Sequence, residues 1–343
     1  MLQHFAEADI LENALLALSP DILNHLLQDQ SLSTREAPKN IRWATDDYVH
    51  LGEGYGYTDP IQPELITGEH GHVVMPRVKK QKNKQAARSR EMAEVFTPSW
   101  ICNAQNNLID ETWFGRSNVF NEEIMLDNGT HSWRTVSAPI GFPEGKTWLD
   151  YVKSTRLEIT CGEAPYLVSR YDTTTGDFIP LPDRIGLLDR KLRVINENVH
   201  NEEAWLEAAR QAYRHTYAYE WQGDSLLLAR EALLVSFIEY HCAKFGHMPS
   251  ISSIDDVAVI VSWNVWQMDG LKGVVPGTCS EKKECTNTLW DGIQETVKPC
   301  TGCKSGRIKE HIGDYCYIKD WDTTDPATGE NGMAIRFIDL LQQ

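Results

Sequence analysis

Apolar residues recur at helical spacing in two long segments of this chain, and a short strand-like run precedes each of them. Residues 202–214 and 225–245 carry the helical pattern, and in the second segment the large aliphatic and aromatic side chains fall toward one face. Residues 156–160 and 217–221 are short runs that end at turn residues, which is typical of strands. Strands that alternate with helices predict an α/β fold with a parallel sheet and helical crossovers.

The first 76 residues are expected to form a helical and irregular extension. Residues 5–28 show a helical pattern that restarts at Ser19-Pro20, where serine suits the N-cap and proline suits the first helical position. We interpret this segment as a helical hairpin docked on the main body, with an oligomerisation arm as the alternative. Residues 31–76 are rich in Gly, Pro, Asp and Thr and predict irregular structure.

The rest of the chain divides into two predicted units. Residues 77–277 contain the strands and long helices, together with an insert at about 111–152 that carries several tryptophans and turn signals. Residues 278–343 hold five of the eight cysteines and are predicted to form a separate Cys-rich module. No run approaches about 18 apolar residues, so the sequence predicts no membrane span.

Compartment and charge limit the classes of function. The acidic first residues do not resemble a secretory signal, so we expect a cytoplasmic protein with thiols or metal ligands rather than disulfides. The net charge of −16 would repel DNA unless a local basic surface exists. One basic segment is predicted to contact DNA phosphates, a solvated linker being the alternative, and its basic residues are Arg77, Lys79, Lys80, Lys82, Lys84, Arg88 and Arg90.

A turn of small residues follows the first predicted strand. Glu158–Leu167 reads Glu-Ile-Thr-Cys-Gly-Glu-Ala-Pro-Tyr-Leu. Small residues at the carboxyl end of a parallel strand let backbone N–H groups approach a ligand. The turn therefore predicts a ligand-binding loop, with an ordinary structural turn as the alternative.

The spacing within this turn resembles the cofactor loop of S-adenosylmethionine-dependent DNA methyltransferases that modify amino groups. The pattern of that family begins with an acid and continues through Cys-Gly to an aromatic residue and leucine, which Glu158, Cys161-Gly162 and Tyr166-Leu167 match. Ile159 and Ala164 depart from its proline and second glycine. The resemblance implies a Rossmann-like methyltransferase sheet with an S-adenosylmethionine pocket.

Two further stretches resemble the same family in the same order. Phe96-Thr97-Pro98 resembles the segment that lies against the methionine part of the cofactor. Glu220 and Trp221 resemble the end of the second strand, where the acid accepts hydrogen bonds from the ribose hydroxyls and the aromatic ring could lie against adenine. The cofactor residues that the resemblance implies are Phe96, Thr97, Pro98, Glu158, Cys161, Gly162, Glu163, Glu220 and Trp221.

Amino methylation also needs acceptors that orient the target amine. The family supplies them with Asn/Asp-Pro-Pro-aromatic, which does not occur in this sequence. The nearest candidate is residues 262–269, in which Asn264 could accept from the amine and Trp266 could stack on a flipped base. The alternative is a buried helix with tryptophans in the core, and Asp269 is another polar partner.

The resemblance implies transfer of a methyl group to adenine amino groups in DNA, within a restriction–modification or phage-defence system. A DNA-binding, cofactor-binding subunit that needs a restriction or specificity subunit as partner is the second reading. A third is a restriction endonuclease, because Asp183 and Asp189-Arg190-Lys191 offer carboxylates and a lysine for a divalent metal.

The Cys-rich module predicts a zinc site. Cys300 and Cys303 have the spacing of a metal knuckle, and a tetrahedral site would need two more ligands. The candidates are Cys279, Cys285, His311 and Cys316, of which we expect His311 and Cys316. Free thiols in a loop-rich tail are the alternative.

Overall fold

The centre of the molecule is a three-stranded parallel sheet. The computed structural model describes residues 12–80, 97–279, 282–288, 292–329 and 331–341, with only the backbone described over 282–298. The strands are β3 (Arg156–Ile159), β4 (Thr216–Glu220) and β5 (Val265–Gln267), in the order β3-β4-β5. The mixed α/β class and the parallel sheet are thus confirmed. The larger Rossmann-like methyltransferase sheet is not, because the described residues contribute only three strands to this sheet.

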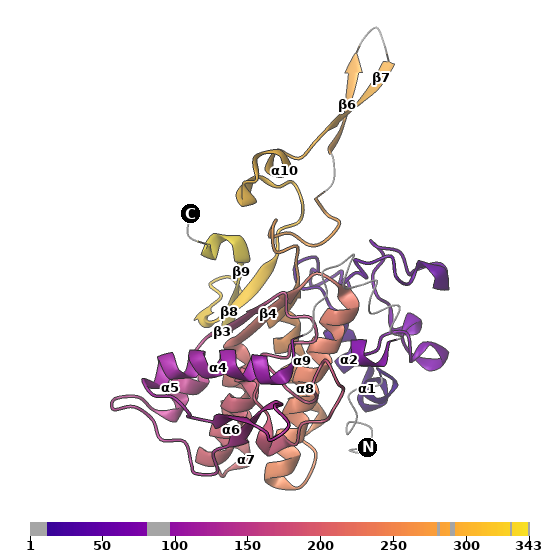
Figure 1. Ribbon diagram of the computed structural model, residues 1–343. Coiled ribbons are helices and arrows are strands. Elements are labelled where there is room, and N and C mark those ends of the chain that lie inside the picture. Colours follow the sequence, from indigo (N-terminus) through magenta and orange to yellow (C-terminus); the bar gives the residue numbers. More distant parts are fainter. Residues whose placement is uncertain (1–11, 81–96, 280–281, 289–291, 330, 342–343) are drawn as a thin grey trace.

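Long helices form a layer against one face of the sheet, below the strands in Figure 1. They are α6 (Leu187–Asn198), α7 (Glu202–Arg214), α8 (Gly223–Phe245) and α9 (Ile251–Asn264). The central helix, α8, is buried on all sides over most of its length. An apolar surface all round a helix is expected where other elements surround it, so α8 forms the middle of the core.

Local sequence sets the ends of these helices. The side chains of Asn201 and Ser250 accept the backbone N–H groups of Ala204 (3.0 Å) and Ser253 (3.1 Å), which caps α7 and α9. Gly246 ends α8 with a φ of 77°, a conformation that glycine adopts without steric cost. The predicted helix boundaries at 202–214 and 225–245 therefore agree closely with the structure.

The N-terminal extension begins with the predicted helical hairpin, α1 (Glu12–Leu18) and α2 (Pro20–Leu27), with Ser19 capping α2. The apolar face of α2 is buried against α8 and α9, so the hairpin docks on the main body as expected. Irregular chain follows, with the short 3-10 helices η2 (Val49–Leu51), η3 (Pro63–Leu65), η4 (Gly68–His70) and η5 (Arg77–Lys79).

The segment before β3 contains a long helix and an antiparallel hairpin. Helix α4 (Ser99–Phe114) leads into β1 (Asn121–Met125) and β2 (His131–Thr135), and α5 (Trp148–Val152) follows. Gly129 sits at the hairpin turn with a φ of 79°. The predicted insert at 111–152 is therefore partly a β-hairpin on the surface.

The C-terminal region divides into two parts. A hairpin of β6 (Lys282–Thr288) and β7 (Gly292–Lys298) projects away from the body at the top of Figure 1, next to α10 (Thr301–Ser305) and η7 (Ile308–Glu310). In contrast, β8 (Tyr317–Thr324), β9 (Asn331–Arg336) and η8 (Phe337–Leu340) cover the second face of the parallel sheet. Trp266 and Phe337 meet there with ring centroids 5.0 Å apart. Residues 278–343 are thus not wholly separate from the main body.

Candidate functional site

The loop after β3 makes a tight turn at the carboxyl edge of the sheet. Thr160, Gly162 and Ala164 all lie in the left-handed region, with φ of 47°, 54° and 57°. Glycine adopts this region freely, whereas a β-branched residue such as threonine rarely does. The N–H of Ala164 donates to the carbonyl of Cys161 at 2.8 Å, which closes the turn. Backbone strain of this kind is concentrated at ligand sites in proteins.

Glu220, the last residue of β4, holds this loop. Its carboxylate accepts the N–H groups of Gly162 (2.8 Å) and Gln222 (3.2 Å), and the N–H of Trp221 is a further donor. Burial raises the pKa of Glu220 above its usual range, although these donors oppose the shift. A carboxylate has about four acceptor positions, so three backbone donors leave capacity for a ligand hydroxyl.

Glu158 is a second buried carboxylate at the same edge. Its side chain accepts backbone N–H groups of Tyr166 and Leu167, yet its Oε2 atom has no hydrogen-bond partner among the described residues. Burial raises the pKa of Glu158 well above its usual range, and the nearby charge of Glu220 adds to the shift. A cationic ligand group would relieve both effects, because a positive charge favours the ionised carboxylate.

The other predicted cofactor residues gather around this loop. The side chain of Thr97 hydrogen-bonds that of Tyr166, and Pro98 follows Thr97 as the N-cap residue of α4. Trp221 follows Glu220 and its side chain hydrogen-bonds Tyr57 of the N-terminal extension. Cys161 is buried, and its carbonyl accepts the N–H of Ala164. Phe96 lies outside the described residues.

Glu163 has a structural partner that the sequence did not predict. Its carboxylate accepts the backbone N–H of Arg77 (2.8 Å) and the hydroxyl of Tyr171 (2.5 Å). The side chain is 5% exposed. Glu163 therefore anchors the start of the basic segment to the loop, and this placement does not support a direct cofactor contact.

The basic segment itself is only partly available for phosphate contacts. The Nζ atom of Lys80 lies 3.0 Å from the carboxylate of Asp224, and the two side chains are 9% and 0% exposed. The prediction that Lys80 binds DNA is therefore wrong, because its charge is used in a buried ion pair. Arg77 is half-buried and Lys79 is exposed. Lys82, Lys84, Arg88 and Arg90 lie outside the described residues.

Asn264 lies at the opposite edge of the sheet from this loop, because it ends α9 immediately before β5 begins. Its side-chain NH2 group lies 2.9–3.2 Å from three backbone carbonyls, which share its two hydrogens, and its oxygen accepts the indole N–H of Trp321 at 2.8 Å. Trp266 is 2% exposed and packs against Tyr219 and Phe337. Asn264 and Trp266 are therefore structural residues. The prediction that they form a catalytic pair is corrected, because both side chains are buried and Asn264 lies at the edge of the sheet opposite the loop.

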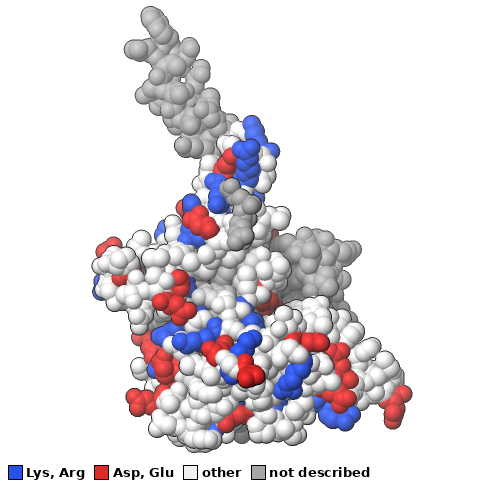
Figure 2. Space-filling model, turned by 90° about the vertical axis from the view of Figure 1, so that its left-hand side faces the viewer, with Lys and Arg blue, Asp and Glu red and all other residues white. Residues whose placement is uncertain are grey.

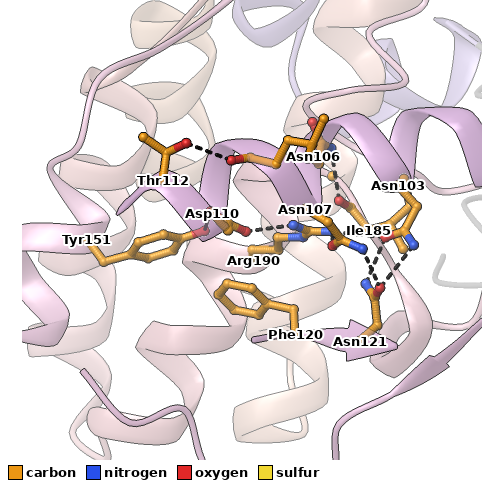
Figure 3. Close-up of polar contacts among 12 residues, drawn as sticks. Asn103, Asn106, Asn107, Asp110, Thr112, Phe120, Asn121, Tyr151, Ile185 and Arg190 are labelled. Atoms are coloured by element: carbon orange, nitrogen blue, oxygen red, sulfur yellow. Dashed lines mark hydrogen bonds and ion pairs between the residues drawn. The ribbon is translucent and has the colours of Figure 1, made fainter. Parts of the chain in front are cut away.

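A buried polar network connects α4 to the loop (Figure 3). The guanidinium of Arg190 binds the carboxylate of Asp110 at 2.6 Å and also donates to Asn103 and Asn107. From the same helix, Asn106 donates to the carbonyl of Tyr166 at 2.9 Å. The run of asparagines on α4 was the available sequence signal for this network, although sequence alone did not identify Arg190 as its centre.

The residues of the restriction-endonuclease hypothesis do not form one site. Asp183, in η6 (Leu181–Asp183), is exposed and accepts the hydroxyl of Thr135. Asp189 is buried against Ser169, whereas the Nζ atom of Lys191 donates to the carbonyl of His215. These three groups have different partners, so the structure does not support the carboxylate-and-lysine arrangement.

Four side chains of the C-terminal region form a cluster that could hold a metal ion such as zinc. They are Cys279, Cys300, Cys303 and His311, and their ligand atoms all lie within 4.8 Å of one another. The Sγ atom of Cys279 lies 3.4 Å from that of Cys300 and 3.7 Å from that of Cys303. The Nδ1 atom of His311 lies 3.5–3.7 Å from the three sulfurs. Ligand atoms around a tetrahedral zinc ion are roughly 3.5–3.8 Å apart, so the cluster has the expected size.

Cys279, and not Cys316, is the fourth member. Cys316 is fully buried in the small apolar core between the sheet and β8. Its thiol donates there to the carbonyl of Gln267 at 3.2 Å. The choice of Cys316 as a ligand is therefore wrong. Cys285 lies on β6, where only the backbone is described.

Backbone geometry supports the Cys300–Cys303 knuckle. Burial opposes ionisation of Cys300, but backbone N–H groups of Cys303 and Ile312 donate to its sulfur and lower the pKa of the thiol to about 6. Gly302 lies so close to His311 that an added Cβ would be 2.6 Å from the backbone nitrogen of His311. These N–H donors are the kind of outer contacts that stabilise a thiolate ligand.

Comparison with known proteins found no matching family model, no similar curated protein and no similar solved structure. Among the described residues, no helix is both long and apolar enough to cross a membrane.

Proposed function

We propose that the carboxyl edge of the parallel sheet binds S-adenosylmethionine, and that the chain is a methyltransferase-like protein of a DNA-modification system. The observation that carries this proposal is the pair of buried carboxylates, Glu158 and Glu220, on either side of the strained loop. S-adenosylmethionine has a positive ammonium, a positive sulfonium and two ribose hydroxyls. Buried acidic acceptors at a parallel sheet edge suit such a ligand.

The residues present fit these chemical groups. Glu220 retains acceptor capacity for a ribose hydroxyl, and the Oε2 atom of Glu158, which has no hydrogen-bond partner among the described residues, suits a positive group. Thr97-Pro98 and Trp221 lie next to the loop, and we assign to them the roles that the sequence resemblance implies. When bound, the cofactor supplies a methyl group that an amine can accept.

Titration calorimetry with S-adenosylmethionine tests the cofactor proposal. Glu220→Gln should weaken binding at least tenfold, because one carboxylate oxygen becomes an NH2 group, which donates and cannot accept the backbone N–H groups or a ligand hydroxyl. Glu36→Gln removes the same charge at an exposed position and should bind like the wild type. Equal affinities in all three proteins, or no binding by the folded wild type, would exclude this site.

The position of Asn264 favours a chain that binds cofactor and needs a partner subunit for methyl transfer. At the carboxyl edge, Asp269 is the polar residue that follows β5, but its carboxylate accepts the N–H groups of Leu271 and Lys272. The second candidate is that the chain alone methylates the adenine amino group of DNA. Label transfer from radiolabelled S-adenosylmethionine to mixed-sequence DNA by the purified chain would establish this second candidate.

The proposed metal of the Cys279–His311 cluster is zinc. Zinc bound by three thiolates and one imidazole typically stabilises small modules with little apolar core. Metal analysis after zinc-replete expression should give one zinc per chain that depends on this cluster. Cys279→Ser should hold one zinc fewer than the wild type, and Cys316→Ser should hold the same amount as the wild type. An unchanged zinc content in Cys279→Ser would contradict the assignment.

A surface for DNA is proposed on the same module, in addition to the exposed Lys79. Figure 2 shows basic side chains gathered below the grey atoms at the top of the molecule. Lys304 is exposed on α10, Lys309 is exposed on η7, and Arg307, which precedes η7, is exposed and pairs with Glu310 at 2.8 Å. Exposed basic side chains contact phosphates with strong salt dependence. The triple alanine variant should lower DNA affinity several-fold in fluorescence anisotropy and reduce its dependence on salt, and an unchanged affinity would exclude this surface.

A further inference from the structure

A second group of metal-binding side chains lies at the far end of the helical layer, away from the cysteines. It consists of Glu202, the first residue of α7, His241 on α8, and His247, which follows the glycine that ends α8. The Nε2 atom of His241 lies 3.0 Å from Oε1 of Glu202, and that of His247 lies 3.6 Å from Oε2. One ligand atom from each residue lies within 4.8 Å of the others.

The hydrogen bonds of the two imidazoles fix which nitrogen carries a proton. Nδ1 of His241 lies 3.1 Å from the carbonyl of His247, and Nδ1 of His247 lies 3.0 Å from the carbonyl of Met248. A carbonyl oxygen can only accept, so both Nδ1 atoms must be donors. Each Nε2 atom faces the Glu202 carboxylate. It carries a lone pair if the imidazole is neutral and a second proton if the imidazole is charged.

The three groups also face one another in a partly buried place. The rings of His241 and His247 have their centroids 5.3 Å apart, and His241 is fully buried between Trp205 and Phe245. Two neutral imidazoles and a carboxylate present acceptor atoms to one point, and a metal cation is a partner that accepts lone pairs from all three.

We infer that Glu202, His241 and His247 form a second metal site, for a divalent transition-metal ion such as Zn²⁺. Metal–nitrogen and metal–oxygen bonds of about 2.1 Å in a tetrahedral site place neighbouring ligand atoms roughly 3.4 Å apart. The contacts of His241 and His247 with the two oxygens of Glu202, at 3.0 and 3.6 Å, lie on either side of that distance. Imidazole and carboxylate ligands suit zinc and its neighbours in the first transition row. The Nδ1–H bonds to backbone carbonyls are the outer contacts that metal-bound histidines usually make.

The site has an open side. Three protein ligands leave at least one coordination position, and the Glu202 and His247 side chains are 42% and 57% exposed, so this position faces solvent. The ion would also connect the start of α7 to the end of α8. This site is independent of the cofactor proposal, because His241 and His247 lie at the end of α8, whereas Glu220 lies just before its start.

The experiment uses the full chain with its cysteine cluster already loaded with zinc. Cobalt(II) is then titrated and followed by absorbance and calorimetry. Cobalt at a site without sulfur gives weak visible bands and lacks the intense near-ultraviolet thiolate band that cobalt in the cysteine cluster would give. The expected result is one further equivalent bound without a thiolate band.

Two surface variants and one matched control complete the test. His247→Ala and Glu202→Gln should each weaken binding of this equivalent at least tenfold. Glu203→Gln removes the same charge from the same helical turn but lies outside the group, and should bind like the wild type. The inference is overturned if the wild type binds no further equivalent, or if both ligand variants bind as tightly as Glu203→Gln. Circular dichroism of each variant checks that it is folded.

Discussion

The backbone N–H of Gly162 donates to the carboxylate of Glu220 across a distance of 2.8 Å. This bond joins the loop after β3 to the last residue of β4, and it holds the loop in its left-handed turn. The two strands are neighbours in the sheet, so the same contact fixes the position of the loop relative to the carboxyl edge.

Replacement of Gly162 by alanine should destabilise the protein without removing this hydrogen bond. The residue has a φ of 54°, and a Cβ in the left-handed region costs about 1 kcal/mol. Urea denaturation should show a loss of that size. Gly141 has ordinary φ and no neighbour near an added Cβ, so Gly141→Ala should leave the free energy of unfolding nearly unchanged. Equal effects of both substitutions would contradict the proposed strain.

The raised pKa of Glu158 predicts a pH-dependent stability. The folded state binds this proton more tightly than the unfolded chain, in which a glutamate has a pKa of about 4.3. Protonated Glu158 therefore stabilises the fold at low pH, and this contribution is lost as the pH rises above the unfolded value. Glu158→Gln should gain stability relative to the wild type as the pH is raised from about 4 to 7. Parallel stability curves for the two proteins would show that Glu158 does not titrate in this way.

The affinity for S-adenosylmethionine should also depend on the ionisation of Glu158, but with the opposite sign: protonated Glu158 stabilises the fold, whereas ionised Glu158 favours binding. A cationic ligand prefers the ionised carboxylate, so binding of S-adenosylmethionine should release a proton and tighten as the pH rises through the raised pKa of Glu158. Calorimetry in buffers of different ionisation enthalpy measures that proton. In Glu158→Gln, the proton release should disappear together with the pH dependence of affinity.

Removal of the Arg190 side chain should be strongly destabilising. Arg190→Ala leaves the Asp110 carboxylate buried beside Tyr151 with only the longer contact to Arg156 at 3.9 Å, and breaking a buried pair costs about 3–5 kcal/mol. Arg134 is 70% exposed and pairs loosely with Glu122, so Arg134→Ala should change stability little. Thermal and urea unfolding distinguish the two, and a loss below about 1 kcal/mol for Arg190→Ala would be inconsistent with the network in Figure 3.

Asn264→Ala should act on folding and not on a reacting amine. The substitution removes the donor shared by the carbonyls of Tyr213, Arg214 and Thr216, at a cost of about 2–4 kcal/mol. Trp321→Phe removes only the bond to the Asn264 oxygen and should cost less. At a temperature where Asn264→Ala is folded, its affinity for S-adenosylmethionine should equal that of the wild type. Selective loss of cofactor binding would contradict the structural role.

Chelation of the bound metal should loosen the cysteine module and leave the helical body folded. The module has few buried apolar residues, whereas the body has an extensive core. After treatment with a chelator, limited proteolysis should cut between residues 279 and 316, and the helical circular dichroism should remain. Loss of the helical signal together with the metal would show that the two parts fold as one unit.

The sequence predicts much of the fold because local signals at several positions agree. Ser19-Pro20 marks a helix start, and the capping residues Asn201 and Ser250 lie where the helical patterns begin. Glu158 and Glu220 could be placed at one edge, since parallel strands end on the same side of a sheet. What the sequence could not reveal was which partners these groups already have within the protein.

Three site predictions failed for reasons that are not local. The spacing of Cys279 and of Cys316 from Cys300 and Cys303 does not distinguish the two as ligands. The difference arises because the chain that enters β8 places Cys316 in the core against Gln267. Asn264 follows a buried apolar run, but that run is helical and the strand begins only after it, which places Asn264 at the amino edge. Lys80 was chosen as an exposed cation, although Asp224, far away in the sequence, binds it in the interior.

The β6–β7 hairpin lies between the first and second members of the cysteine cluster, Cys279 and Cys300. Its two ends therefore meet at the proposed metal, and the pairing of Lys282 with Lys298 continues outward from that point. An arm joined to the protein in this way can change in length or sequence without a change in the helical body. The hairpin is therefore a suitable attachment site for a peptide or a fluorescent label that reports on the binding partners of the module.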